Sequence, residues 1–468
     1  GPTFSLAVLK QALGKHFQPG SLRALRERGY FAESEEGWLS FPHALVQEAL
    51  YHSLSTKLRR QTHRRIGHVM ESLLTKQDSI YYANLANHFR LAGVKPKAIH
   101  YSIAAADQLF AALSFPEARN YFQTAYELLQ RRKDSRKWEV GLKLAKTMMH
   151  TGNTIEALRL ARKLRRQSRR IKLRDLYVDA SILQFDAMRR ISDYSYLPFA
   201  LRLLNTTQKR VAGAGRLRLI HLAGSTLFWM GRPDKAEYFL RQLVQSETIS
   251  RETDTALSAH VFLATIEADR QDFSAAYETI HKALRLAQQT GNVYQELRIR
   301  NEWAGILLDN QRVEEARAML TELLPCAEAL GDFYLVALVL VGLGDAAVKQ
   351  QEWEVAETYL QDAISLFSSL GLAHGKAKAL LLKGVAAFYR QQYIRAMDLY
   401  GGAIEIFEKG GEMVEACHGY YNLSEVCMML GKKTEAEDWY KKGIHSFRAK
   451  DNPQLAKLYE ELRSMLSK

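Results

Sequence analysis

An alanine recurs with a fixed 40-residue period through the second half of the chain, and this repeat constrains the fold more than any other feature. A second small residue stands twelve positions before each alanine. The alanines are Ala236, Ala276, Ala316, Ala356, Ala396 and Ala436, and the small residues are Gly224, Ala264, Ala304, Gly344, Gly384 and Ser424. Self-similarity at a fixed period of this length is typical of a solenoid, in which supersecondary units stack on one another. The sequence therefore predicts a stacked repeat protein, and such stacks mostly bind other molecules.

One copy of the repeat shows how each unit should fold. An apolar stretch over residues 333–349 contains Gly344, and the polar pair Gln350-Gln351 separates it from a second stretch with apolar side chains three and four residues apart. This spacing predicts two amphipathic helices. Gly344 and Ala356 are predicted to lie where the helices approach closely, because a larger side chain would push the pair apart. Gly371 is predicted to end the second helix in the left-handed conformation.

The pattern resembles the tetratricopeptide repeat. That family has Leu-Gly in the first helix, Ala twelve residues later, a large residue four further on and then Ala, which here reads Leu343-Gly344, Ala356, Leu360 and Ala363. The period is longer than the family's usual one of roughly 34 residues, and Gly replaces the proline that usually closes the repeat. The resemblance covers about residues 215–468. It implies an all-α, right-handed superhelical solenoid.

Residues 1–75 follow a different pattern. A short helix is expected around Leu6, and residues 30–31 and 38–41 flank the polar turn 34–37, which predicts a β-hairpin. Pro42 is then expected to open a long helix at its first position. Helices followed by a hairpin wing form the plan of a winged-helix domain. We therefore expect three parts: a winged-helix-like domain in 1–75, irregular helical repeats in 76–215 and regular 40-residue repeats in 216–468.

This N-terminal segment resembles the winged-helix region that follows the ATPase module of STAND-type signalling ATPases. The motif Phe-x-His-x-Leu-x-x-Glu-x-x-Tyr occurs here as residues 41–51, and Arg-x-x-His-x-x-Ile occurs as residues 60–66. In related ATPases the motif histidine touches the phosphates of the bound nucleotide. The resemblance thus implies a nucleotide-phosphate contact for His43 in a longer parent protein, and the alternative is that His43 packs against Trp38 and Phe41. The ATPase module, with its ATP or ADP, would lie upstream of Pro2.

The chain itself carries no catalytic motif. The phosphate-binding pattern Gly-x-x-x-x-Gly-Lys-Ser/Thr and the nucleophile elbow Gly-x-Ser-x-Gly are both absent, and the 14 histidines show no metal-ligand spacing. Cys326, Cys417 and Cys427 are predicted to be reduced core residues. No run of 18 apolar residues and no signal peptide occur, so we expect a cytoplasmic protein without a membrane span. The chain is therefore predicted to be no enzyme, and to hold neither a metal nor a cofactor of its own.

Charge is distributed unevenly along the chain. Residues 1–235 have a net charge of +22, and residues 236–468 have a net charge of −8. Eight basic residues crowd into positions 162–174. This run suggests a polyanion surface, and the alternative is a solvated helix face, because no aromatic residues interleave the run. The candidate residues are Arg162, Arg165, Arg166, Arg169 and Arg170.

The first helix of each tetratricopeptide repeat lines the concave side of the stack. With Gly344 as the eighth position, positions two, five, nine, twelve and thirteen face inward. They include Asp309, and we predict partner contacts for Arg298, Asn301, Lys378, Phe388, Tyr389, His418, Tyr421 and Glu425. A lining of charged, amide and aromatic groups suits an extended peptide or a protein helix.

The leading functional hypothesis is therefore the effector-binding sensor arm of a STAND-like ATPase regulator, with a protein or peptide in the groove. Two alternatives stay open. One is a DNA-binding transcriptional regulator that uses the winged helix and the basic run. The other is a peptide receptor that acts alone.

Overall fold

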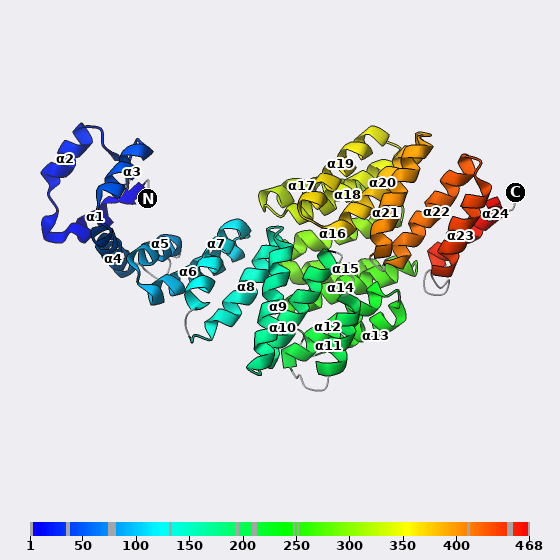
Figure 1. Cartoon of the computed structure of the whole chain (residues 1–468), viewed down its shortest axis with the longest axis horizontal. Helices are drawn as coiled ribbons and strands as arrows, with labels where there is room; N and C mark the ends of the chain where they lie inside the picture. Colours follow the sequence, from blue (N-terminus) through cyan, green and yellow to red (C-terminus); the bar gives the residue numbers. More distant parts are fainter. Residues whose placement is uncertain are drawn as a thin grey trace. The chain divides into compact units, whose positions relative to one another are not determined.

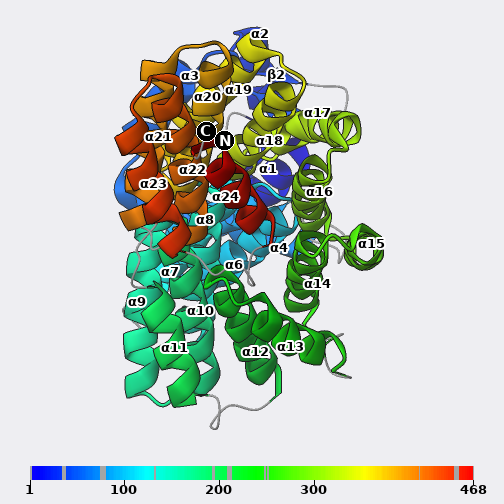
Figure 2. The same cartoon turned by 90° about the vertical axis from the view of Figure 1, so that its right-hand side faces the viewer.

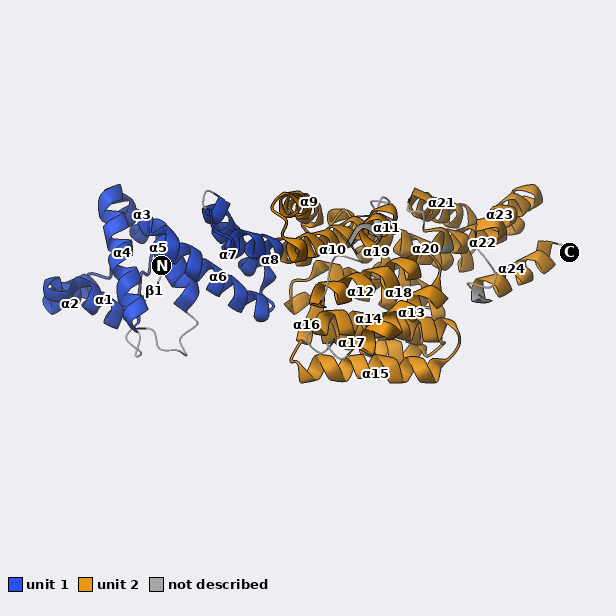
Figure 3. Ribbon diagram, turned by 90° about the horizontal axis from the view of Figure 1, so that it is seen from below, with its two compact units in different colours: residues 1–144 blue, residues 145–468 orange. Residues whose placement is uncertain are grey.

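Helices make up nearly all of the described chain, and in this computed structural model they form two units, residues 1–144 and 145–468 (Figure 3). The structure describes residues 3–33, 38–73, 81–130, 133–191, 196–207, 213–246, 249, 252–409, 412–446 and 453–466. None of the described helices is both long enough and apolar enough to cross a membrane.

The first unit begins with a small mixed segment and continues with helix pairs. Its elements are β1 (Thr3–Ser5), α1 (Leu6–Leu13), the 3-10 turn η1 (Gly14–His16), α2 (Pro19–Glu27), β2 (Ala32–Glu33), β3 (Trp38–Ser40), α3 (Ala44–Ser53), α4 (Thr56–Leu73), α5 (Tyr82–Ala92), α6 (Lys95–Ala111) and α7 (Phe115–Gln130). Strand β3 lies in the middle of an antiparallel sheet of order β1-β3-β2, with Phe4 opposite Leu39 and Ala32 opposite Ser40. Leu39 is fully buried and anchors the sheet to the helices.

The predicted hairpin is confirmed by the pairing of β2 with β3, although its turn, residues 34–37, lies outside the described residues. The strand β1 was not predicted, because three residues give too short a pattern to read. The prediction that Pro42 opens the next helix is wrong. Helix α3 begins at Ala44, since His43 is still extended, with φ −122° and ψ 114°, and serves as the N-cap residue.

The second unit is a series of antiparallel helix pairs. The bounds are α8 (Arg136–His150, which crosses the unit boundary), α9 (Thr154–Arg170), α10 (Arg174–Arg190), α11 (Tyr196–Thr207), α12 (Gly213–Trp229), α13 (Pro233–Val244), α14 (Thr253–Asp269), α15 (Phe273–Gln289), α16 (Val293–Asp309), α17 (Val313–Ala329), α18 (Phe333–Lys349), α19 (Trp353–Ser369), α20 (Ala373–Tyr389), α21 (Tyr393–Lys409), α22 (Met413–Met429), α23 (Lys433–Ser446) and α24 (Pro453–Leu466). From α14 to α22 the first helices of the pairs are equal in length, and they begin at the same position of each successive repeat. The predicted period is thus the period of the fold.

Small side chains stand where the two helices of a pair meet. A Cβ atom added to Gly344 would lie 2.6 Å from Cγ of Leu360, and one added to Gly384 would collide with the ring of Tyr400. In the last regular copy the hydroxyl of Ser424 donates to the carbonyl oxygen of Ala436 at 2.7 Å. These contacts confirm the predicted close approach of the two helices.

Two turns of different composition link the helices. The turns after α15, α17 and α19 have glycine in the left-handed region, as predicted for Gly371, which has φ +68°. The turns inside the four pairs from α14 to α21 have a left-handed glutamine instead, for example Gln351 with φ +62°, whereas the turns inside α12–α13 and α22–α23 have the left-handed glycines Gly231 and Gly431. The sequence predicted this polar break, but its positive φ was not predicted because glutamine has no special preference for that conformation.

The first helix of each pair lies toward the inside of the curve and the second lies outside (Figures 1 and 2). Figure 2 shows this most clearly for α15, which flanks α14 and α16 on their outer side. The all-α repeat fold is therefore as expected, and the hand of the superhelix stays a prediction.

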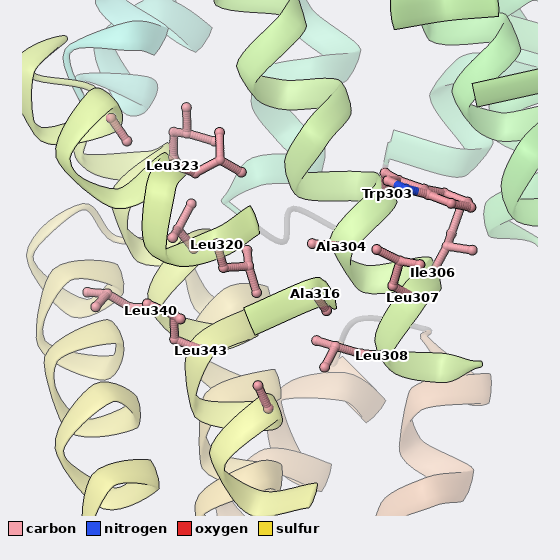
Figure 4. Packing of buried hydrophobic residues seen from close by; sticks show 14 of the residues in the cluster. Trp303, Ala304, Ile306, Leu307, Leu308, Ala316, Leu320, Leu323, Leu340 and Leu343 are labelled. Atoms are coloured by element: carbon pink, nitrogen blue, oxygen red, sulfur yellow. The ribbon is translucent and has the colours of Figure 1, made fainter. Parts of the chain in front are cut away.

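Buried side chains form a continuous core from α14 to α20. Figure 4 shows Leu307 of α16, Leu320 of α17 and Leu343 of α18 within this core. Each pair shares its apolar face with its neighbours, so no repeat has a core of its own. This packing aligns the inner faces of successive first helices, which is what positions the candidate site.

Candidate partner-binding groove

A polar junction joins the start of the second unit to its middle. His150, the last residue of α8, lies with Nδ1 3.7 Å from Oδ2 of Asp332, which precedes α18. The hydroxyl of Tyr294 on α16 donates to the same oxygen at 2.9 Å. Arg190 of α10 donates to the carbonyl oxygen of Met149 at 3.1 Å. We call this cluster the α8–α18 junction. It brings α8 and α10, from the start of this unit, against α16 and α18 from its middle.

Burial and charge act in opposite directions within the junction. Burial alone would raise the pKa of Asp332, but the imidazole of His150 and the backbone N–H of Leu335 lower that pKa overall. Burial lowers the pKa of His150, against the pull of the Asp332 carboxylate. The aspartate is therefore charged and the histidine neutral near pH 7.

Arg298 and Asn301 lie one turn apart on α16, beside this junction, and both are half-buried. The Arg298 guanidinium carbon is 6.0 Å from the centroid of the Tyr294 ring. Burial raises the pKa of Asp186 on α10, while Arg189, Arg190 and Arg298 act to lower it. Neither Arg298 nor Asp186 forms an ion pair or a side-chain hydrogen bond with any residue that the structure describes.

A strip of charged residues continues from α14 to α22. Asp309, at the end of α16, reaches solvent, yet desolvation raises its pKa, while Lys349, Lys378 and His418 act to lower it. A carboxylate that is exposed but poorly hydrated is expected at the floor of a groove, where protein walls exclude much of the water. The three partners come from α18, α20 and α22, so four successive first helices contribute to one surface.

Two further aspartates share this environment. Desolvation raises the pKa of Asp269 to about 6, helped by the charge of Asp309. The pKa of Asp345 is also raised to about 6 by desolvation, although Lys349 lies 3.8 Å away. Burial lowers the pKa of His418 despite the nearby carboxylates. The strip can thus change its charge between about pH 5 and 7.

Aromatic side chains lie at the C-terminal end of the strip. Tyr389 on α20 is 62% exposed and stacks on Trp353, with centroids 5.4 Å apart and planes 12° apart. Tyr421 on α22 donates from its hydroxyl to Oε1 of Glu425 at 3.0 Å, and burial raises the pKa of Glu425. Phe388 packs against Tyr393 of α21 at 5.6 Å, so part of its ring belongs to the repeat core.

Of the predicted residues, Lys378 and His418 lie near Asp309, and Tyr389 lies near Tyr421, while several residues beside them were not predicted. Asp269 and Lys349 hold the same position in their repeats as Asp309 and Tyr389, so the 40-residue phase could have identified them. No such signal existed for His150 or for Asp186, because both lie in the irregular copies before residue 216. They meet the regular repeats only through the curvature of the solenoid.

The other predicted sites lie elsewhere. His43 is exposed at the start of α3 rather than packed against Trp38 and Phe41. Cys417 and Cys427 are buried as predicted, but Cys326 is exposed on α17, so its prediction as a core residue is wrong. The apolar neighbours of Cys326 in sequence belong to the inward stripe, whereas Cys326 lies on the outward one. Among the described residues, no three His, Cys, Asp or Glu side chains are grouped closely enough to hold a metal.

Comparisons with known proteins agree with the repeat fold. Models of the tetratricopeptide repeat match residues 295–369 and 341–410. No curated protein matches the chain. The similar solved structures include the Rap conjugation gene regulator of the plasmid pLS20 in complex with the Phr* peptide, at 11% identity and a TM-score of 0.50 over 69% of this chain and 93% of that one. The chain therefore contains tetratricopeptide repeats within an all-α solenoid.

Two further structures are similar at lower TM-scores. A Rap protein complexed with competence and sporulation factor has 15% identity and a TM-score of 0.49, over 71% of this chain and 99% of that one. A STAND protein with a tetratricopeptide-repeat sensor from Pyrococcus horikoshii has 14% identity and a TM-score of 0.41, over 99% of this chain and 63% of that one.

Proposed function

We propose that the inner face of the second unit binds an extended peptide or a protein segment, and that this chain acts by binding rather than by catalysis. The observation that carries the proposal is the environment of the exposed Asp309, with Lys349, Lys378 and His418 of the three following first helices around it. Charged groups in such a groove can fix the register in which a peptide binds, and an exposed aromatic ring can anchor one of the peptide's side chains.

The groove offers complementary groups along its length. Arg298 can donate to a carboxylate or a backbone carbonyl, the aspartates Asp269 and Asp309 can accept from donors, and Tyr389 offers an exposed ring. Asn301, Lys378, His418, Tyr421 and Glu425 are the further contacts of this proposal. The peptide in the structure of the pLS20 regulator supports the proposal by analogy of fold, whereas the residues named here belong to this chain alone.

We further propose that this binding unit is the sensor arm of a STAND-like regulator in the cytoplasm. The order β1-β3-β2, with the β2–β3 hairpin as the wing, supports a winged-helix-like domain in 1–75, followed by the irregular repeats of 76–215 and the regular repeats of 216–468. His43 is exposed at the beginning of α3, where it can reach a nucleotide phosphate held by another module. A full-length gene without a phosphate-binding loop would leave the stand-alone peptide receptor as the better hypothesis.

The binding proposal is tested with a displayed peptide library selected on the whole chain. Tyr389→Ala with Tyr421→Ala is expected to weaken the selected peptide by about 2 kcal/mol or more, the scale of an interface hot spot. The matched control is Tyr238→Ala with Tyr277→Ala, which removes two exposed tyrosines from the outer helices α13 and α15. Equal affinity of both double variants would show that the groove is not the site.

A further inference from the structure

Helix α9 carries a basic stripe that the peptide groove does not use. Seven of its seventeen residues are basic and one, Glu156, is acidic. Arg159, Lys163, Arg166 and Arg170 follow one another at spacings of four, three and four residues, and all four are exposed. This spacing places them on a single face of the helix, over a length of about 16 Å. We call these four residues the α9 stripe.

The arginines of this stripe are not neutralised by the described part of the chain. Arg159, Arg166 and Arg170 form no ion pair or hydrogen bond with a described residue, and neither does the neighbouring Arg169. Several surface arginines of the later repeats differ, since they pair with carboxylates, although the exposed Arg232 and Arg285 pair with none among the described residues. Examples are Arg241 with Glu237 at 2.6 Å, Arg270 with Asp234 at 2.7 Å and Arg317 with Glu352 at 2.8 Å.

Basic residues on the other face of α9 serve the packing of the solenoid. Arg165 donates from Nε to Oε1 of Gln184 on α10 at 2.8 Å, and its guanidinium lies 5.3 Å from the centroid of the Phe199 ring on α11. The candidate set predicted from the sequence is thus divided. Arg165 belongs to the interior contacts, Arg162 is half-buried, and Arg166, Arg169 and Arg170 are exposed. Their helix, α9, lies on the outer side of α10 (Figure 2).

Like charges one turn apart repel each other and destabilise a helix by about 0.2–0.5 kcal/mol per pair. The arginines of the α9 stripe have no carboxylate partners among the described residues to reduce this repulsion. An extended external anion can reduce it instead. We propose that the α9 stripe binds the phosphate backbone of duplex nucleic acid. Guanidinium groups suit this role, because they bond phosphate oxygens with two parallel hydrogen bonds.

The composition of the stripe favours a duplex over other polyanions. No aromatic side chain lies in α9, so single-stranded bases would find no stacking platform. Exposed large apolar residues lie only beyond the two ends of the stripe, as Ile155 on one side and Ile171 and Leu173 on the other, so the stripe between them has nothing to insert into a lipid surface. Contacts to phosphates alone carry no sequence information, and the binding is therefore sequence-independent.

The test uses the whole chain and a fluorescent duplex DNA of about 24 base pairs with random sequence, followed by anisotropy between about 50 and 200 mM KCl. The stripe variant changes Arg159, Lys163, Arg166 and Arg170 to Gln. The matched control changes Lys432, Lys433, Lys441 and Lys457 to Gln, four exposed lysines of α23, α24 and the turn before α23, and removes the same net charge. Circular dichroism checks that both variants keep their helicity.

The wild-type chain is expected to bind the duplex with a slope of about −4 in a plot of log binding constant against log salt concentration, which corresponds to four neutralised phosphates. The stripe variant should bind at least about tenfold more weakly at 50 mM salt and with a shallower slope, and the control should bind like the wild type. Three results would overturn the proposal: no wild-type binding at 50 mM salt, equal loss in both variants, or binding to phosphatidylserine vesicles without binding to the duplex. Peptide binding in the groove is expected to survive in the stripe variant, so the two proposals can fail separately.

Discussion

His150 Nδ1 and Asp332 Oδ2 lie 3.7 Å apart, although one residue ends α8 and the other precedes α18. Asp332 also accepts hydrogen bonds from the backbone N–H groups of Tyr334 and Leu335, both at 3.0 Å, and so caps α18. One buried carboxylate therefore serves a helix terminus, a neighbouring repeat through Tyr294 and a distant helix through His150. Removal of this carboxylate should therefore destabilise the folded chain more than removal of an ordinary helix cap.

Asp332→Ala is expected to destabilise the chain by about 3 kcal/mol, because it removes a cap and leaves the hydroxyl of Tyr294 buried without its acceptor. The control is Asp272→Ala, since exposed Asp272 caps α15 with one bond to the N–H of Ala275 at 3.0 Å. That change should cost about 1 kcal/mol. Urea unfolding followed by circular dichroism measures both. A cost for Asp332→Ala no larger than for Asp272→Ala would mean that the α8–α18 junction adds no stability.

Two glycines in the same helix pair should respond to alanine in opposite ways. Gly384→Ala is expected to destabilise by about 1–2 kcal/mol, because the new methyl group meets the Tyr400 ring. Gly401→Ala lies in the interior of α21 with no atom within 4 Å of the new Cβ, and it should stabilise by about 0.5–1 kcal/mol. Thermal unfolding compares the two variants. Stabilisation by both would show that the helices of this pair do not touch at Gly384.

The raised pKa of Asp345 implies a cost in stability that depends on pH. Its folded value of about 6 exceeds its ordinary value of 3.8, so the folded chain binds the extra proton more readily between those values. Stability therefore falls as pH rises from about 4 to 6, and the loss is complete above pH 6. Asp345→Asn should raise the free energy of unfolding by about 3 kcal/mol at pH 8 and change it little at pH 4.

Asp234→Asn is the control for this measurement, because its side chain is 84% exposed and pairs only with Arg270 among the described residues. It should change stability by less than about 0.5 kcal/mol at either pH. A gain for Asp345→Asn that is the same at both pH values would contradict a desolvated carboxylate in the groove.

Only one of the three cysteines should react in the folded chain. Cys326 is exposed, whereas burial raises the pKa of Cys417 to about 12 and also raises that of Cys427. Since the thiolate is the reactive form, the two buried thiols should be inert to a disulfide reagent at pH 8. Titration is expected to detect one thiol in the native chain and three after denaturation. Rapid reaction of all three in the native chain would mean that α22 is not buried as described.

Much of the fold could be predicted because it is local. The 40-residue phase of Ala356 and Gly344 predicted the helix pairs and their closest contact, since one small residue fixes the distance between two helices of any copy. The phase also predicted a common region for Lys378, His418 and Tyr421. The predicted start of α3 was wrong because proline also fits the extended segment before a helix, and His43 is still extended. The predicted burial of Cys326 was wrong because an apolar sequence neighbourhood does not define which face of α17 a residue lies on.

The sequence by itself determined the repeat, the pairing of helices and the direction in which each first helix faces, because these follow from contacts between residues close along the chain. Only the tertiary structure decided how far the solenoid curves. Curvature is the sum of small rotations between neighbouring repeats, and each depends on the packing of many side chains at once. That sum brings His150 to Asp332 and Asp186 toward Arg298, and it places Lys349, Lys378 and His418 near Asp309.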